Sequence, residues 1–122
     1  MVEAFIGDDL QKITRYTEFE VAPSNERLDV KLDSPEKDFA WDSRFESAIK
    51  IDEPRHVWTA EVRIPLQKLS ATKPSAGTRW RLNLYRCDRA HKAFLAWNPT
   101  LQNSFHAPER FGFLVFDASP PQ

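Results

Sequence analysis

The stretch Trp80-Arg-Leu-Asn-Leu-Tyr-Arg86 alternates apolar and polar side chains along its whole length. Successive side chains of a β-strand point to opposite faces of the sheet, so the tryptophan and the two leucines share one face. The same period of two recurs at Trp58–Ile64, Leu28–Leu32 and Glu18–Val21. The pattern predicts strands with one face on a core and the other in solvent or in a groove.

Turn clusters rich in proline, glycine, asparagine and aspartate separate these segments. A single helical turn is expected at Pro65–Leu69, because proline suits the first helical position. Many short strands joined by turns predict an all-β, antiparallel sandwich of jelly-roll type. We expect one domain at 1–117, a disordered tail at 118–122, and strands near residues 2–6, 14–22, 27–33, 45–52, 56–64, 79–88, 92–97 and 112–117.

Composition restricts the partners of the chain. Its 122 residues carry 17 basic and 18 acidic side chains, a formal net charge of -1, so no basic surplus favours nucleic acid. The charges are interspersed, and no apolar run approaches the length of a membrane span, so no membrane partner is expected. No signal peptide is visible. Cys87 is the only cysteine, which excludes an intrachain disulfide and a four-cysteine zinc site.

Five local patterns follow one another in a defined order, at Val2–Ile6, Tyr16–Val21, Trp58–Leu66, Trp80–Arg86 and Trp97–Phe113. This order resembles the C-terminal part of a family 9 carbohydrate-binding module. It is most similar to the family 9-like proteins that end in Phe-His-x-Pro-x-x-Phe-Gly. The resemblance covers nearly the whole chain. It implies a jelly-roll sandwich that binds saccharides without catalysis, often beside glycoside hydrolases in carbohydrate catabolism, and secreted or periplasmic.

The resemblance also implies a site, in which a sugar lies between two tryptophans and polar side chains bond its hydroxyls. Glu3 matches the sugar-binding glutamate of the family, and Phe105 falls where one clamp tryptophan lies. Gln102 and Asn103 fall at neighbouring carboxamide positions, whereas Glu20 falls where the family has an arginine. Aromatic rings beside carboxamides suit sugars, because the ring covers the C–H face and the amides bond hydroxyls.

Further residues have two interpretations each. The His106 ring could bond a sugar hydroxyl or a carboxylate, or fix its loop through a backbone carbonyl. Arg81 and Tyr85 could line a groove, or lie on an exposed or dimer-buried strand face. In the last segment, Trp97, Phe111 and Phe113 are expected in the core. The predicted saccharide site is Glu3, Arg81, Tyr85, Gln102, Asn103, Phe105 and His106, acting by stacking and hydrogen bonds, with no catalytic residue, metal or cofactor.

The second clamp tryptophan and the N-terminal strands of the family sandwich lie upstream of the Val2–Ile6 pattern, and this sequence begins at Met1. An incomplete sandwich leaves open edges and exposed core. We therefore expect either a missing N-terminal segment or a homodimer in which one protomer covers the other.

Three other functions are alternatives to saccharide binding. A structural, self-associating module needs no sugar. Haem binding is disfavoured because Met1 is the only methionine. A role within a glycoside hydrolase would need a carboxylate pair such as Glu18 and Glu20, which share one strand face. We expect these two instead to be solvated and paired with Arg63 or Arg81 on a neighbouring strand. Cys87, His91 and His106 match no metal-ligand spacing.

Overall fold

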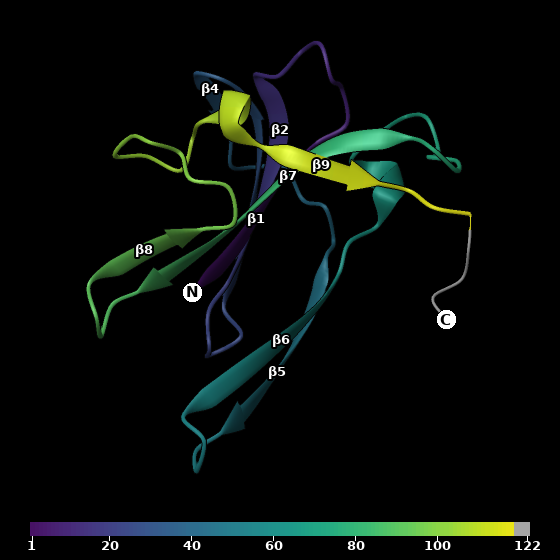
Figure 1. The fold of residues 1–122 in the computed structure, drawn as a ribbon. Helices are drawn as coiled ribbons and strands as arrows, with labels where there is room; N and C mark the ends of the chain where they lie inside the picture. Colours follow the sequence, from purple (N-terminus) through teal and green to yellow (C-terminus); the bar gives the residue numbers. More distant parts are fainter. Residues whose placement is uncertain (119–122) are drawn as a thin grey trace.

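A computed structural model describes residues 1–118 (Figure 1). No helix in this range is long and apolar enough to cross a membrane. The two helical pieces are short 3₁₀ turns at Leu66–Lys68 and Pro108–Arg110. The strands are β1 Val2–Gly7, β2 Arg15–Val21, β3 Arg27–Asp33, β4 Glu36–Asp38, β5 Glu46–Asp52, β6 Val57–Arg63, β7 Arg79–Asp88, β8 Ala93–Ala96 and β9 Gly112–Val115.

All eight predicted strands and the predicted helical turn are confirmed, and each strand ends within two residues of its expected bounds. The short strand β4 was not predicted, because its three charged residues are exposed and show no alternation. The tail predicted for 118–122 lies outside the described residues from 119 onward.

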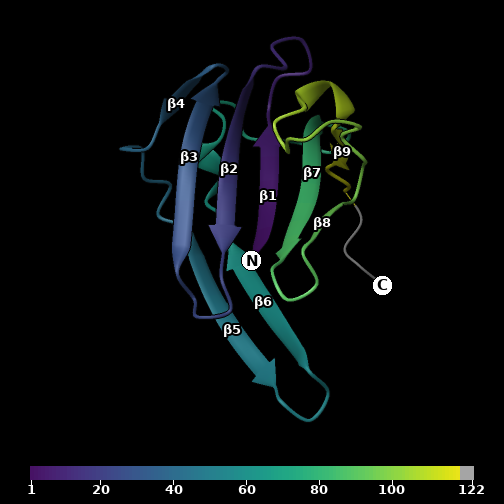
Figure 2. The same ribbon diagram turned by 90° about the vertical axis from the view of Figure 1, so that its left-hand side faces the viewer.

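The strands form two antiparallel sheets. The larger has the order β4-β3-β2-β1-β7-β8, and β9 pairs with the same edge of β7 as β8 does, further toward its beginning. The smaller is the hairpin β5–β6, which lies across one face of the larger sheet (Figures 1 and 2). The fold is therefore an all-β antiparallel sandwich, as the sequence predicts.

The hairpin covers what we call the hairpin face of the large sheet. Phe19, Trp80 and Phe45 are at the centre of its core, and Ile49 and Ala60 of the hairpin pack against them. The opposite face, here the loop face, is covered by the long loop 97–111 between β8 and β9. Its core combines four aromatic rings with two aliphatic side chains, and consists of Phe5, Tyr16, Val30, Leu32, Tyr85 and Phe111.

Two core predictions are wrong. Phe111 is buried as expected, but Trp97 and Phe113 are 55% and 51% exposed. Trp97 lies against Gly112, where an added Cβ would be 2.8 Å from the indole. Phe113 is covered by the guanidinium of Arg79, 4.0 Å from the ring centroid. The two rings are on opposite faces of the large sheet, because Phe113 pairs with Arg81 on the loop face whereas the backbone of Trp97 bonds Leu84 on the hairpin face.

Candidate functional site

The loop that covers the loop face is attached through one buried carboxamide. Asn83 on β7 is completely buried, and its Nδ2 donates to the Tyr85 hydroxyl at 2.8 Å and to the Asn98 carbonyl at 2.9 Å. Its Oδ1 accepts from the backbone N–H groups of Leu84 and Asn98, at 3.0 and 2.9 Å. Every polar atom of this side chain is thus used to hold the loop onto the strand.

Three aromatic rings continue from this anchor toward the surface. The Phe105 ring stacks on Tyr85 with a centroid distance of 4.2 Å and an interplanar angle of 16°. The Tyr85 hydroxyl donates to the Phe105 carbonyl at 2.8 Å, which fixes the stack. Phe94 on β8 meets Phe105 edge-on at 6.0 Å and is 74% exposed. Phe94 is therefore the solvent-facing ring, supported by two rings beneath it.

A cavity of about 620 Å³ lies beside these rings. This volume is within the range of small-molecule sites. The exposed Phe94 and Leu101 contribute apolar surface, and Gln102 and Asn103 contribute carboxamides. The other lining residues are Cys87, Leu95, Ala96, Pro99, Thr100, Ser104 and Phe105. The structure thus brings three of the predicted site residues, Gln102, Asn103 and Phe105, to one cavity.

Three carboxylates gather on the neighbouring strands of the loop face. Antiparallel pairing puts Glu3 of β1 directly opposite Glu20 of β2, and Glu18 lies two residues along the same face. One oxygen from each of the three lies within 4.8 Å of the others. Glu3 is 7% and Glu18 6% exposed. We call this set the carboxylate cluster.

Burial governs the protonation of the carboxylate cluster. Loss of water, a side-chain hydrogen bond with Glu20 and repulsion from the Glu20 carboxylate together raise the pKa of Glu18 to about 8. Burial also raises the pKa of Glu3, although the Cys87 thiol opposes this by donating to Glu3 Oε1 at 3.3 Å. The same burial and the same carboxylate raise the pKa of Cys87 to about 11, so the thiol stays protonated.

The expected basic partners of Glu18 and Glu20 do not reach them. Arg63 lies on the hairpin and contacts Glu46, with 3.5 Å between Nη1 and Oε2. Arg81 donates from Nη2 to the Pro108 carbonyl and lies over the Phe111 ring. The prediction of a solvated, arginine-paired strand face is therefore wrong, because the loop covers this face and uses Arg81 to hold itself in place.

His106 joins the loop to the far side of the carboxylate cluster. Its Nδ1 is 2.9 Å from the Tyr16 hydroxyl and its Nε2 is 2.9 Å from Lys37 Nζ. Because an ammonium only donates, Nε2 accepts and the ring proton is on Nδ1. Burial and the Lys37 charge lower the pKa of His106, which favours this neutral form. Nε2 lies 3.9 Å from Glu18 Oε2, so the ring fixes its loop through tyrosine and lysine rather than through a backbone carbonyl.

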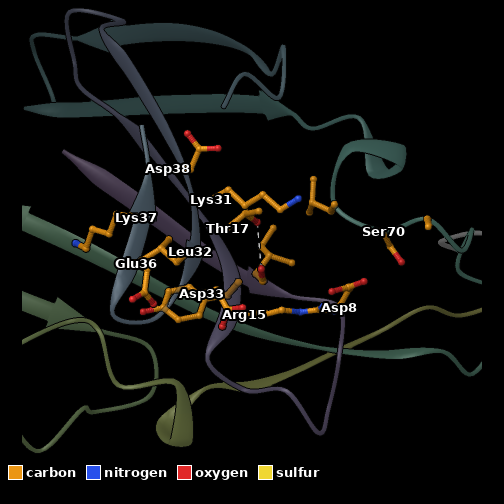
Figure 3. A pocket seen from close by; sticks show the side chains of 14 residues that line it. Asp8, Arg15, Thr17, Lys31, Leu32, Asp33, Glu36, Lys37, Asp38 and Ser70 are labelled. Atoms are coloured by element: carbon orange, nitrogen blue, oxygen red, sulfur yellow. Dashed lines mark hydrogen bonds between the residues drawn. The ribbon is translucent and has the colours of Figure 1, made fainter. Parts of the chain in front are cut away.

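A second cavity, of about 500 Å³, opens on the hairpin face between β1–β4 and the segment 69–71. Arg15 extends toward Asp8 there, and Lys31 toward the segment that carries Ser70 (Figure 3). Its charged side chains have both signs, and the one ring in its lining, Tyr16, is 4% exposed. This cavity contains none of the predicted saccharide residues and offers no open aromatic surface among its described lining residues.

Sequence reasoning missed Phe94 and the position of Cys87 between the cavity and the carboxylate cluster. The signal for Phe94 was its place in the expected strand at 92–97. Phe94 pairs with Cys87 of β7, and this register places the Phe94 side chain on the loop face, the same face as Tyr85. Tyr85 and Arg81 lie under the loop and outside the cavity lining, while Glu3 reaches the cavity through Cys87.

The molecule is thus an antiparallel β-sandwich domain with an aromatic, carboxamide-lined cavity on one face. The chain belongs to the carbohydrate family 9 binding domain-like family, whose model matches residues 1–118. This confirms the resemblance read from the sequence.

Two known proteins are similar over most of the chain. An extracellular protein of Arthroderma benhamiae is 27% identical over 134 residues, which cover 95% of this chain and 60% of that protein. The crystal structure of a proposed carbohydrate-binding protein from Bacteroides uniformis superposes with a TM-score of 0.74 at 21% identity, again over 95% of this chain and 60% of the other. The fold is therefore shared, and the chain spans about 60% of the length of each relative.

Proposed function

We propose that this chain is a non-catalytic saccharide-binding module whose ligand lies in the cavity beside Phe94. The single observation that carries the proposal is the Phe94 ring, 74% exposed yet supported by Phe105, at the mouth of a cavity lined by Gln102 and Asn103. Family membership supports carbohydrate binding in general. An open ring beside exposed carboxamides suits a sugar, and Gln102, whose Nε2 donates to the His106 carbonyl at 3.2 Å, keeps its Oε1 to accept from a hydroxyl.

In this proposal the ligand stacks its C–H face on Phe94, with Phe105 beneath the ring. Gln102 and Asn103 bond hydroxyls, and the Glu3 carboxylate accepts from a hydroxyl at the inner end, next to Cys87. A shallow stack with a few hydrogen bonds gives a Kd of about 10⁻⁶ M or weaker. No bond in the saccharide is broken.

Arg81, Tyr85 and His106 act in the proposal by positioning the loop. Tyr85 supports Phe105 from below, Arg81 holds the Pro108 carbonyl, and His106 connects the loop to Tyr16. Their removal weakens binding by releasing the loop rather than by removing a contact to sugar.

The proposal is tested by a glycan-array screen followed by calorimetry on the best ligand. The Phe94→Ala variant is expected to bind about 10-fold more weakly, because it loses the apolar area buried against the ring and a stacking contribution of about 0.5–1.5 kcal/mol. The matched control is Phe39→Ala, which removes a ring 64% exposed outside the cavity lining and leaves affinity unchanged. Equal affinity of the Phe94 variant and the wild type would place the ligand elsewhere.

Self-association is the second candidate, favoured by apolar side chains left open on the hairpin face of β7 and β8. Leu84, Leu95 and Trp97 are 45%, 53% and 55% exposed. Sedimentation velocity at micromolar concentration is expected to show a dimer that Leu95→Lys converts to monomer. A wild-type monomer, together with a bound glycan, leaves saccharide binding as the function.

A further inference from the structure

We infer that the cavity beside Phe94 selects a neutral saccharide that carries a methyl-terminated group, either the methyl of a 6-deoxy sugar or an acetyl, and that Leu101 contacts this group. The inference rests on the proposed function and adds to it the class of ligand and a further binding residue. The shared chemistry is one small apolar group on an otherwise hydroxylated ring.

The first argument is the lack of charge in the cavity. Among the residues that the structure describes, those lining this cavity include no acidic and no basic side chain. The Cys87 thiol stays protonated there, because burial raises its pKa to about 11. Behind the thiol lies the Glu3 carboxylate, 3.3 Å from Cys87 Sγ. An acidic sugar would thus leave water without gaining a cation from this lining, so a neutral saccharide fits better.

The second argument is the small number of polar groups left for hydroxyls. The Thr100 hydroxyl donates to the Gln102 carbonyl at 3.0 Å, and Gln102 Nε2 donates to the His106 carbonyl at 3.2 Å. Ser104 Oγ accepts from the His106 N–H at 3.1 Å. Within the described lining, Asn103 is the polar residue whose side chain makes no such bond. A fully hydroxylated sugar would therefore bury hydroxyls without partners, which is unfavourable.

The third argument is a leucine held at the cavity in a left-handed backbone conformation. Leu101 has a φ of 59°, and its side chain is 79% exposed, the largest exposed fraction among the described large hydrophobic residues. The other described non-glycine residues with positive φ are all polar. Strained positions of this kind gather at ligand sites. The hydrogen bond from Thr100 to Gln102 spans Leu101 and holds this turn.

Apolar side chains reach the cavity from two separate elements. Phe94 comes from β8, whereas Pro99 and Leu101 come from the loop 97–111. A sugar that stacks its C–H face on Phe94 can then place a substituent against Leu101. Burying one methyl group there favours binding about 4-fold, whereas a hydroxyl in the same place would lose its bonds to water.

The test begins with a glycan array and continues by calorimetry on two matched pairs of ligands. L-Fucose is compared with L-galactose, which has a hydroxymethyl group in place of the methyl. Acetylated xylo-oligosaccharides are compared with the same oligosaccharides after alkaline removal of their acetyl groups. We expect the methyl-bearing member of one pair to bind at least about 4-fold more tightly, and that pair identifies the source of the methyl group.

The outcomes separate the inference from the proposed function on which it rests. Binding only to glycans without a methyl-terminated group, or no preference within either pair, would overturn the inference and leave saccharide binding intact. A wild type that binds no glycan would overturn the proposed function, and the inference with it. Phe94→Ala is expected to weaken both members of a pair, because both stack on that ring.

Variants at Leu101 test its contact with the methyl group. Leu101→Asn keeps a residue that adopts the left-handed conformation readily, so it is expected to fold with an unchanged or higher Tm. It should bind both members of the selected pair equally. Leu10→Asn changes a leucine 44% exposed outside the cavity lining and should keep the wild-type preference. Leu101→Gly replaces the first variant should that lose its native circular dichroism. A preference that survives in the folded Leu101 variant would overturn the inference.

Discussion

Both faces of the large sheet contain completely or almost completely buried side chains, but their chemistry differs. On the hairpin face Trp80 and Phe19 are each 2% exposed and belong to one cluster of buried apolar side chains. On the loop face Phe5 and Asn83 are fully buried beside Glu3 and Glu18, which are 7% and 6% exposed.

This difference in chemistry separates the face that stabilises the fold from the face that can bind a ligand. Burying apolar surface stabilises the fold by about 25 cal/mol per Å². Burying carboxylates next to one another opposes folding. The hairpin face is therefore arranged as a folding core, whereas the loop face keeps polar groups where a ligand could use them.

The largest effect is expected at the hairpin face. Trp80→Ala removes a ring that packs edge-on against Phe116 at 4.9 Å, and should lower the free energy of unfolding by about 3–5 kcal/mol in urea titration. A loss below about 1 kcal/mol would mean that this face is not the main core.

The second-largest effect is expected for Asn83→Ala, which tests the loop face with its buried polar groups. It leaves the Asn98 N–H and carbonyl without their Asn83 partners, so a loss of about 1–3 kcal/mol is expected in the same urea titration. Saccharide affinity should fall with it, because the loop that carries Gln102 and Asn103 is released. Gln67→Ala, an exposed amide in the first 3₁₀ turn, serves as the control and should match the wild type in both measurements.

Phe94→Ala should change the free energy of unfolding by no more than about 0.5 kcal/mol, because its ring is mostly in water. The same variant is expected to bind the saccharide about 10-fold more weakly, so a large change in affinity should accompany a small change in stability. A destabilisation as large as that of Trp80→Ala would instead make Phe94 part of a core.

The smallest effect concerns the two tyrosines, Tyr16 and Tyr85, both on the loop face. Burial raises both pKa values, that of Tyr85 to about 12, whereas an unfolded tyrosine titrates near 10. The folded state therefore holds these protons more tightly than the unfolded state, and stability falls as the pH rises above about 10. Absorbance at 295 nm should stay flat up to about pH 11 in the native protein and rise near pH 10 in urea. A native tyrosinate signal near pH 10 would show an open loop.

Much of the fold follows from local pattern. Alternation located the strands to within two residues and put Trp80 opposite Tyr85, because side-chain direction in a strand is a local property. Alternation could not say which face would be covered, so Trp97 was predicted in the core, and Tyr85 in a groove or on an exposed or dimer-buried strand face. In the structure 55% of Trp97 is exposed, and Tyr85 is 3% exposed because the chain's own loop covers it.

The sequence by itself determined an all-β chain, its strand positions, its family and the shared face of Glu18 and Glu20. Tertiary structure alone decided that Glu3 lies across from Glu20, that Phe94 reaches the stack above Tyr85, and that Asn83 anchors the loop. Register and loop packing join residues far apart in the chain. A one-residue slip would turn every side chain of a strand to the other face, so no local pattern can specify these contacts.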